Sequence, residues 1–109
     1  MEIDNLKQYN NTISCYDKAI QLNPNDAIAY NNKGTALQNI NKYNNAIDCY
    51  DQAIQLNPNY ANAYRNKGYL LTDIKNYQQA IENYKQAIKS CKSNQNEFRR
   101  LIIELIGLK

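Results

Sequence analysis

The sequence predicts an all-α fold, built as an array of stacked helical hairpins, and three observations support this prediction. The chain of 109 residues repeats itself at a fixed interval of 34 residues. Apolar residues within each repeat follow the spacing of one helical face rather than the alternation of a strand. The tripeptide Asn-Pro-Asn closes two successive repeats, at residues 23–25 and 57–59. A period of this length is typical of arrays whose unit is one supersecondary element.

Several sets of residues keep the 34-residue interval without a gap. Tyr30 recurs as Tyr64, and Gly34 recurs as Gly68. Two tyrosine triplets and one alanine–isoleucine triplet share the register: Tyr9, Tyr43 and Tyr77; Tyr16, Tyr50 and Tyr84; Ala19-Ile20, Ala53-Ile54 and Ala87-Ile88. The units are therefore expected to be copies of one structural element.

Each unit is predicted to be two helices joined by a short turn. The second helix carries one apolar stripe, formed by Ala46, Ile47, Tyr50, Ala53 and Ile54. The polar residues 39–42 are short enough for a helix-to-helix turn. Proline disfavours a helical residue before it, and Asn25 or Asn59 is expected to cap the helix that follows. The predicted helices cover residues 3–21, 27–40, 43–56, 61–74, 77–91 and 95–106.

A glycine in the first helix of each hairpin indicates a close approach of two helices. Glycine inside a helix costs about 1 kcal/mol relative to alanine, so it needs a packing reason. Gly34 and Ala46 are expected to meet where one hairpin closes, as are Gly68 and Ala80. The tyrosines would fill the space on either side.

These residues resemble the tetratricopeptide repeat. The resemblance is carried by Tyr30, Gly34, Leu37, Ala46, Tyr50, Ala53 and Pro58, and again by Tyr64, Gly68, Leu71, Ala80, Tyr84 and Ala87. It covers about residues 7–92, with lysine at positions 33 and 67, where the family often has leucine, and Lys92 in place of a third Asn-Pro. We expect one domain over residues 1–109, divided into a partial repeat (1–26), two repeats (27–60 and 61–94) and a capping helix (95–109).

The resemblance implies a right-handed α-solenoid whose concave groove binds a peptide segment of a partner protein, as in a scaffold or adaptor. The first helix of each hairpin would line this groove. The candidate residues face away from the Tyr/Gly/Leu stripe: Asn31, Asn32, Thr35, Gln38, Asn62, Arg65, Asn66, Tyr69, Asp73, Arg99 and Arg100. Asn32 and Asn66 occupy equivalent places and resemble the asparagine ladder that holds a peptide backbone, because an amide both donates and accepts. Solvated asparagines in a chain with 19 of them are the alternative reading.

One subclass of the family binds the acidic tails of chaperones through a clamp of two lysines, an arginine and two asparagines. The corresponding positions here are Asn31, Thr35, Asn66, Asn96 and Arg100. Three of the five differ from the clamp, which disfavours chaperone tails as the ligand.

Composition argues against several other functions. Histidine is absent, which removes the usual general base and metal ligand, so we expect no enzyme activity, no metal and no cofactor. Cys15, Cys49 and Cys91 form no CxxC pair and are odd in number, which favours unbridged thiols and a reduced, cytoplasmic setting. Apolar runs such as residues 101–103 are too short for a membrane span, and no signal peptide is visible.

Two alternatives to peptide binding were weighed. An RNA-binding array of the related 35-residue type is disfavoured by the strict period and by the net charge of −1 over residues 1–84, although residues 85–109 carry +4. A structural module, for oligomerisation or as a spacer within a longer superhelix, is the stronger alternative. Terminal helices of an array must hide their stacking faces, and exposed apolar residues there would allow a homodimer. The residues concerned are Leu6, Ile13, Ile102 and Ile106.

Overall fold

The fold is all-α throughout the part of the chain that the computed structural model describes, residues 2–90 and 95–107, with side chains for residues 5–90 and 99–107. The helices are α1 (Glu2–Leu22), α2 (Ala27–Asn39), α3 (Tyr43–Leu56), α4 (Ala61–Asp73), α5 (Tyr77–Ser90) and α6 (Gln95–Gly107). Their ends differ from the expected ones by no more than one residue. The all-α prediction and its helix pattern are confirmed.

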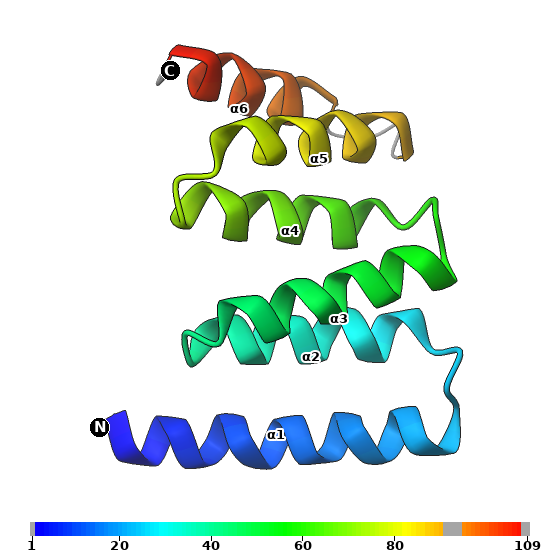
Figure 1. The fold of residues 1–109 in the computed structure, drawn as a ribbon. Coiled ribbons are helices and arrows are strands. Elements are labelled where there is room, and N and C mark those ends of the chain that lie inside the picture. Colours follow the sequence, from blue (N-terminus) through cyan, green and yellow to red (C-terminus); the bar gives the residue numbers. More distant parts are fainter. Residues whose placement is uncertain (1, 91–94, 108–109) are drawn as a thin grey trace. The chain divides into compact units, whose positions relative to one another are not determined.

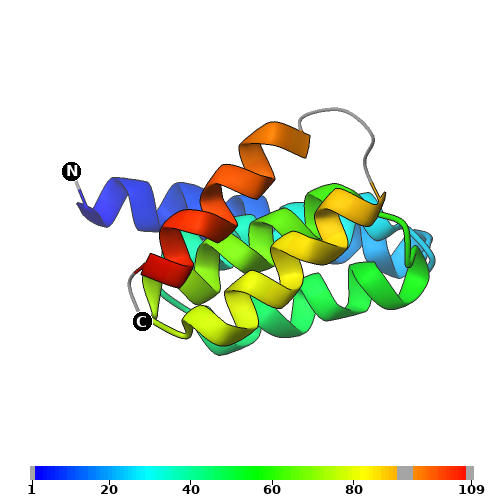
Figure 2. The same cartoon turned by 90° about the horizontal axis from the view of Figure 1, so that it is seen from above.

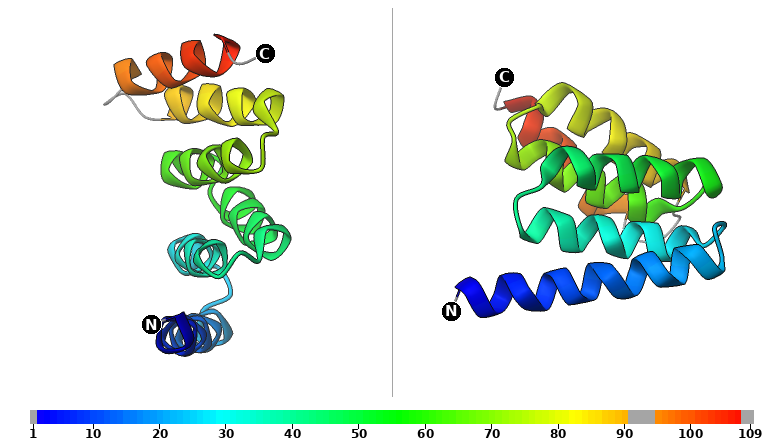
Figure 3. Two further views of the ribbon diagram at one scale, coloured as in Figure 1. Left: turned by 90° about the vertical axis from the view of Figure 1, so that its left-hand side faces the viewer. Right: turned by 60° about the horizontal axis from the view of Figure 1, so that its bottom comes forward.

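The chain divides into two compact units, residues 1–57 and 58–109. In the first unit, α2 and α3 form an antiparallel hairpin, and α1 lies alongside α2 (Figures 1 and 3). In the second unit, α4 and α5 form the equivalent hairpin, and α6 crosses α5 (Figures 1 and 2). Each unit therefore contains one complete hairpin and one additional helix.

A buried tyrosine fills the interior of each hairpin. Tyr50 and Tyr84 are 0% and 1% exposed, and each ring lies against the glycine of the opposite helix. A Cβ atom added to Gly34 would lie 2.7 Å from Cε1 of Tyr50, and one added to Gly68 would lie 2.5 Å from Cε1 of Tyr84. The prediction that glycine permits a close approach is correct, but the nearest atoms belong to the tyrosine ring rather than to Ala46 or Ala80.

Each hairpin turns at a residue with a left-handed backbone. Asn41 and Lys75, 34 residues apart, have φ angles of 65° and 63°. After α2, the amide of Lys42 bonds to the carbonyl of Leu37 at 3.0 Å, and that of Asn41 bonds to Gln38 at 3.0 Å. The same pair of bonds follows α4. This is the Schellman arrangement, which satisfies the last carbonyls of a helix and reverses the chain.

The start of α2 differs from the sequence prediction. Asp26, not Asn25, is the N-cap, and its side chain accepts a hydrogen bond from the amide of Ala29 at 3.1 Å. At the equivalent place before α4 the cap is Tyr60, which forms no side-chain cap bond. Asn23 instead uses its side-chain oxygen to accept from the amide of Asn25, which closes an Asx turn around the proline. The predicted capping role of Asn25 and Asn59 is therefore wrong.

The two cysteines that the structure describes are free thiols in different environments. Cys49 is buried, and burial raises its pKa. Cys15 is exposed. Cys91 lies outside the described residues. Among the helices described, none has the length and apolarity that crossing a membrane requires.

Candidate functional site

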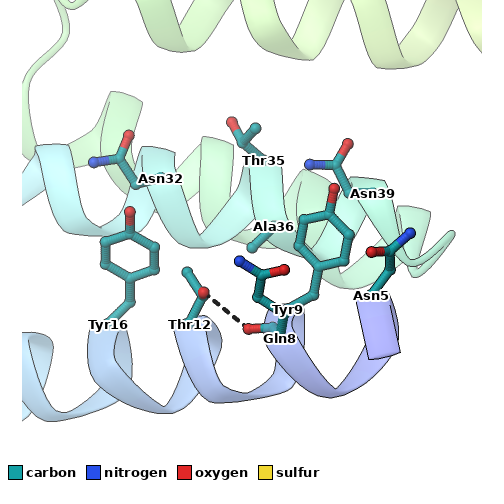
Figure 4. Close-up of a pocket in the computed structure, with 9 residues that line it drawn as sticks. All are labelled: Asn5, Gln8, Tyr9, Thr12, Tyr16, Asn32, Thr35, Ala36 and Asn39. Atoms are coloured by element: carbon teal, nitrogen blue, oxygen red, sulfur yellow. Dashed lines mark hydrogen bonds between the residues drawn. The ribbon is translucent and has the colours of Figure 1, made fainter. Parts of the chain in front are cut away.

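A pocket of about 290 Å³ lies between α1 and α2 in the first unit (Figure 4). Five of its residues come from α1 and four from α2: Asn5, Gln8, Tyr9, Thr12 and Tyr16; Asn32, Thr35, Ala36 and Asn39. Its volume falls just below the usual range for drug-sized ligands, about 300–1,000 Å³.

Helical spacing explains how these side chains come to one place. Residues three and four positions apart share a helix face, so Tyr9, Thr12 and Tyr16 form one stripe along α1. A matching stripe along α2 consists of Asn32, Thr35, Ala36 and Asn39. Figure 4 shows both tyrosine rings rising from α1 toward α2. The groove is thus built from two parallel stripes of side chains.

The pocket is neutral but rich in hydrogen-bonding groups. None of its nine residues is charged, and the lining consists of amides, hydroxyls and one alanine. Among these nine residues a single side-chain hydrogen bond forms, from Oγ1 of Thr12 to the carbonyl of Gln8 at 2.9 Å (Figure 4). The amide of Asn32 and the hydroxyl of Tyr16 therefore do not bond to each other. Both can donate and accept, which is the chemistry that peptide groups recognise.

The hydroxyls of the two buried tyrosines, Tyr50 and Tyr84, lie within hydrogen-bond distance of polar side chains. Tyr50 donates to Oε1 of Gln38 at 2.8 Å, and Oγ1 of Thr35 lies 3.3 Å from the same hydroxyl. The hydroxyl of Tyr84 lies 3.3 Å from Oγ1 of Thr72. Burial raises the pKa of both tyrosines, that of Tyr84 to about 12, so both are neutral at pH 7. Each is held by polar side chains of the opposite helix.

The structure brings two of the predicted groove residues, Asn32 and Thr35, into this pocket. Asn31 behaves differently, because it is only 5% exposed. Its predicted place on an open groove surface is therefore wrong: it is a buried polar residue of α2, adjacent in sequence to the pocket. Gln38 is half-buried and is used by Tyr50.

The other predicted residues belong to the second unit. Asn62 and Asp73 are exposed on α4, and Arg99 and Arg100 are exposed on α6. Arg65, Asn66 and Tyr69 are half-buried on α4.

Two of these side chains have notable surroundings. The ring of Tyr69 meets that of Tyr84 edge-on, with centroids 5.8 Å apart. Tyr69, predicted as a groove residue, therefore also packs against a buried tyrosine of the core. The Nε atom of Arg65 is buried without a hydrogen-bond partner among the described residues.

Lys33, where the family often has leucine, has a structural role on the other side of α2. Its Nζ lies 2.6 Å from Oδ1 of Asp17 on α1. The hydrogen bond to Asp17 raises the pKa of Lys33 and outweighs the opposing effect of burial. The ion pair joins α1 to α2 on the face that also contains Cys49, away from the neutral pocket. No group of three or more metal-binding side chains occurs among the described residues.

The sequence prediction did not include the α1 residues of the pocket, because it placed the groove on the first helix of each hairpin. The 34-residue register contained the necessary signal. It makes Tyr16 the counterpart of Tyr50 and Tyr84, and α1 the counterpart of α3 and α5. No glycine-bearing helix precedes α1 in the described chain, so the face of Tyr16 was a candidate surface.

Comparison with known families is consistent with this register. Tetratricopeptide-repeat models match residues 27–60 and 49–82, and a model described as TPR repeat matches residues 5–41. Together they extend over residues 5–82. The chain is a tetratricopeptide-repeat protein. The match at 27–60 has the same bounds as the first complete repeat predicted from the sequence.

Solved structures of the family resemble this tetratricopeptide-repeat protein over most of its length. The TPR2B domain of yeast Sti1, solved as a complex with pHsp70, has a TM-score of 0.86 and 25% identity, with 94% of this chain and 86% of that chain covered. The first TPR of Spaghetti (RPAP3), bound to the HSP90 peptide SRMEEVD, shares the fold with a TM-score of 0.84 and 20% identity, covering 94% and 80%.

A third structure is YrrB, described as a TPR protein with an unusual peptide-binding site. It has a TM-score of 0.76 and 26% identity, with 84% of this chain and 46% of that chain covered. No curated protein sequence gives a significant match.

Proposed function

We propose that this tetratricopeptide-repeat protein is a protein-interaction module that binds a peptide segment of a partner through the groove between α1 and α2. The observation that carries the proposal is the neutral pocket lined by Asn32, Thr35 and the stripe of α1. Similar folds solved with bound peptides, such as the Sti1 and Spaghetti domains, support the class of function. An interaction module of this kind needs no catalytic group.

The chemistry of the pocket favours a neutral segment over an acidic tail. A carboxylate ligand requires cationic partners, and the nine lining residues provide none. The clamp position that should hold a lysine is the buried Asn31. Amides and hydroxyls instead suit the backbone and the polar side chains of a neutral peptide.

Asn32 is the residue whose amide would hold the peptide backbone, with Asn66 as its counterpart one repeat later. A groove this small should give an affinity in the micromolar range, roughly −8 kcal/mol.

Selection from a displayed library of random peptides tests the proposal. Selected peptides should bind the wild-type chain and should lose about tenfold or more in affinity with Asn32→Ala, as expected for a central contact. Asn66→Ala, the equivalent change on α4 of the second unit, is measured separately. Asn11→Ala is the matched control, because Asn11 is exposed on α1 and outside the pocket. The proposal fails if no peptide is enriched, or if the selected peptides bind Asn32→Ala as well as they bind the wild type.

A structural module remains the second candidate because of apolar residues on the end helices. Leu6 on α1 is 47% exposed, and Ile106 on α6 is 56% exposed. Ile13 and Ile102, expected to belong to the same surfaces, are half-buried. Sedimentation of the chain distinguishes the two functions, since self-association through these faces depends on concentration and is lost with Leu6→Asn or Ile106→Asn.

A further inference from the structure

We propose that the segment bound between α1 and α2 is a helix of a partner protein, with a glycine or alanine against the ring of Tyr16 and a hydroxyl or amide side chain one turn later. This inference rests on the proposed function and specifies its ligand. An extended peptide and a second copy of this chain are the alternatives that the experiment below separates from it.

The internal repeat shows what covers this kind of surface. Tyr16 is the counterpart of Tyr50 and Tyr84, whose rings are covered by α2 and α4. In the described chain α1 has no such covering helix. Residues 5–8 are in register with the turn residues 39–42, but in α1 they are helical and continue straight. The surface that α2 covers on α3, and α4 covers on α5, therefore stays open on α1.

Burial shows the same difference at three neighbouring positions. On α3 and α5 the residues at these positions are at most 1% exposed: Ala46, Tyr50 and Ala53; Ala80, Tyr84 and Ala87. On α1 the equivalent residues are all half-buried: Thr12, Tyr16 and Ala19. Two of these three are in contact with the pocket. A helix placed there would bring α1 to the burial that its two counterparts already have.

The covering helices also define the pattern that a ligand needs. Gly34 lets α2 approach the ring of Tyr50, and Gln38, four residues later, accepts from its hydroxyl. Gly68 and Thr72 repeat the arrangement on Tyr84. Residues four apart lie on one helix face, so both contacts come from the same side of the covering helix. The ring of Tyr16 and its hydroxyl offer the same two contacts to a visiting helix.

A second copy of this chain is a poor fit as the occupant. Its helices with the required pattern, α2 and α4, already cover tyrosines of their own chain. Their counterpart in the repeat, α6, has Ile102 in the register position of Gly34 and Gly68. A branched side chain at that position would press on the tyrosine ring. The neutral lining also matches the uncharged face that α2 presents around Gly34.

A synthetic peptide with the sequence of residues 26–40 is the probe, because it contains the covering pattern of α2. Its binding to the intact chain is measured by fluorescence anisotropy, and its position by amide chemical shifts. Binding should be lost, by about tenfold or more, when the peptide carries Gly34→Leu, since the added side chain overpacks the contact. Tyr16→Ala in the protein should weaken binding as much, and Tyr16→Phe should weaken it less.

Each alternative has its own outcome. If Tyr16→Ala has no effect on binding, the peptide has displaced α2 or bound elsewhere, and the inference is overturned. Equal binding of the Gly34→Leu peptide also overturns it. A peptide that does not bind is tested again as a fusion, tethered to the amino terminus by a flexible linker, because a short tether supplies about millimolar effective concentration. The inference is overturned if the tethered segment does not raise the melting temperature either.

Dimers that dissociate on Tyr16→Ala would assign the surface to a second copy instead. Another outcome is library peptides that depend on Asn32 for binding and yet lack the residue spacing of a helix. That result would support the proposed peptide binding and would overturn only the inference that the bound segment is a helix.

Discussion

At the scale of single residues, the contact between a glycine and a tyrosine decides whether a hairpin can close. Tyr50 is fully buried and its ring lies where the Cβ of any residue other than glycine at position 34 would be. The ring cannot move away, because its hydroxyl is bonded to Gln38 and the surrounding positions are occupied by buried alanines. Burial of this large aromatic side chain therefore offsets the helix-propensity penalty of glycine.

Gly34→Ala should destabilise the protein despite the higher helix propensity of alanine. The substitution gains about 1 kcal/mol in propensity, while overpacking a filled core costs about 1–3 kcal/mol. A net loss of up to about 2 kcal/mol follows, read as a lower urea midpoint. Gly107→Ala is the matched control, because an added Cβ there meets nothing within 4 Å. A Gly34→Ala midpoint above that of the wild type would contradict the packing described.

At the scale of elements, the start of α2 shows how a polar residue can take a role that its neighbour was expected to have. Asp26→Ala should cost about 0.5–2 kcal/mol, because the amide of Ala29 loses its side-chain acceptor. Asn25→Ala tests the cap predicted from the sequence and should change the free energy of unfolding by less than about 0.5 kcal/mol. Chemical denaturation of both variants decides between the two residues, and a larger effect at Asn25 would restore the sequence prediction.

The helices were predictable from the sequence because their signals are periodic and repeated. The apolar stripe of α3 and the glycine of α2 each recur 34 residues later, so each assignment was made twice. Caps and side-chain directions are not constrained in this way. Asn31 and Asn32 are adjacent in sequence, yet one is buried and the other lines the pocket, because a single residue step turns the side chain by about 100° around the helix.

The candidate site was only half predictable, for a related physical reason. A repeat motif identifies which residues pack inside a complete hairpin, but among the described helices α1 contacts only α2 and forms no such hairpin. Thr12 and Tyr16 therefore matched core positions by sequence while lining a pocket in the structure. Tyr69 shows the converse, since it departs from the repeat pattern and yet packs on the buried Tyr84.

At the scale of the whole molecule, stability should be distributed unevenly within each unit. Helices α2 to α5 each contain four or five buried residues. Among the side chains described, α1 has none in this class, and α6 has only Leu105. Local opening free energies follow the number of buried contacts, so the end helices should open without the hairpins.

Native-state hydrogen exchange tests this distribution. Amides in the middle of α1 should exchange about tenfold or more faster than those of α2 and α3, a difference of roughly 1.4 kcal/mol in opening free energy. Comparing α1 with α3 is informative because the two are counterparts in the repeat and differ mainly in the covering helix. A helical ligand in the pocket should slow exchange in α1 more than in α3, since α3 is already covered. Equal protection of α1 and α3 in the free protein would mean that the open face of Tyr16 has no effect on stability.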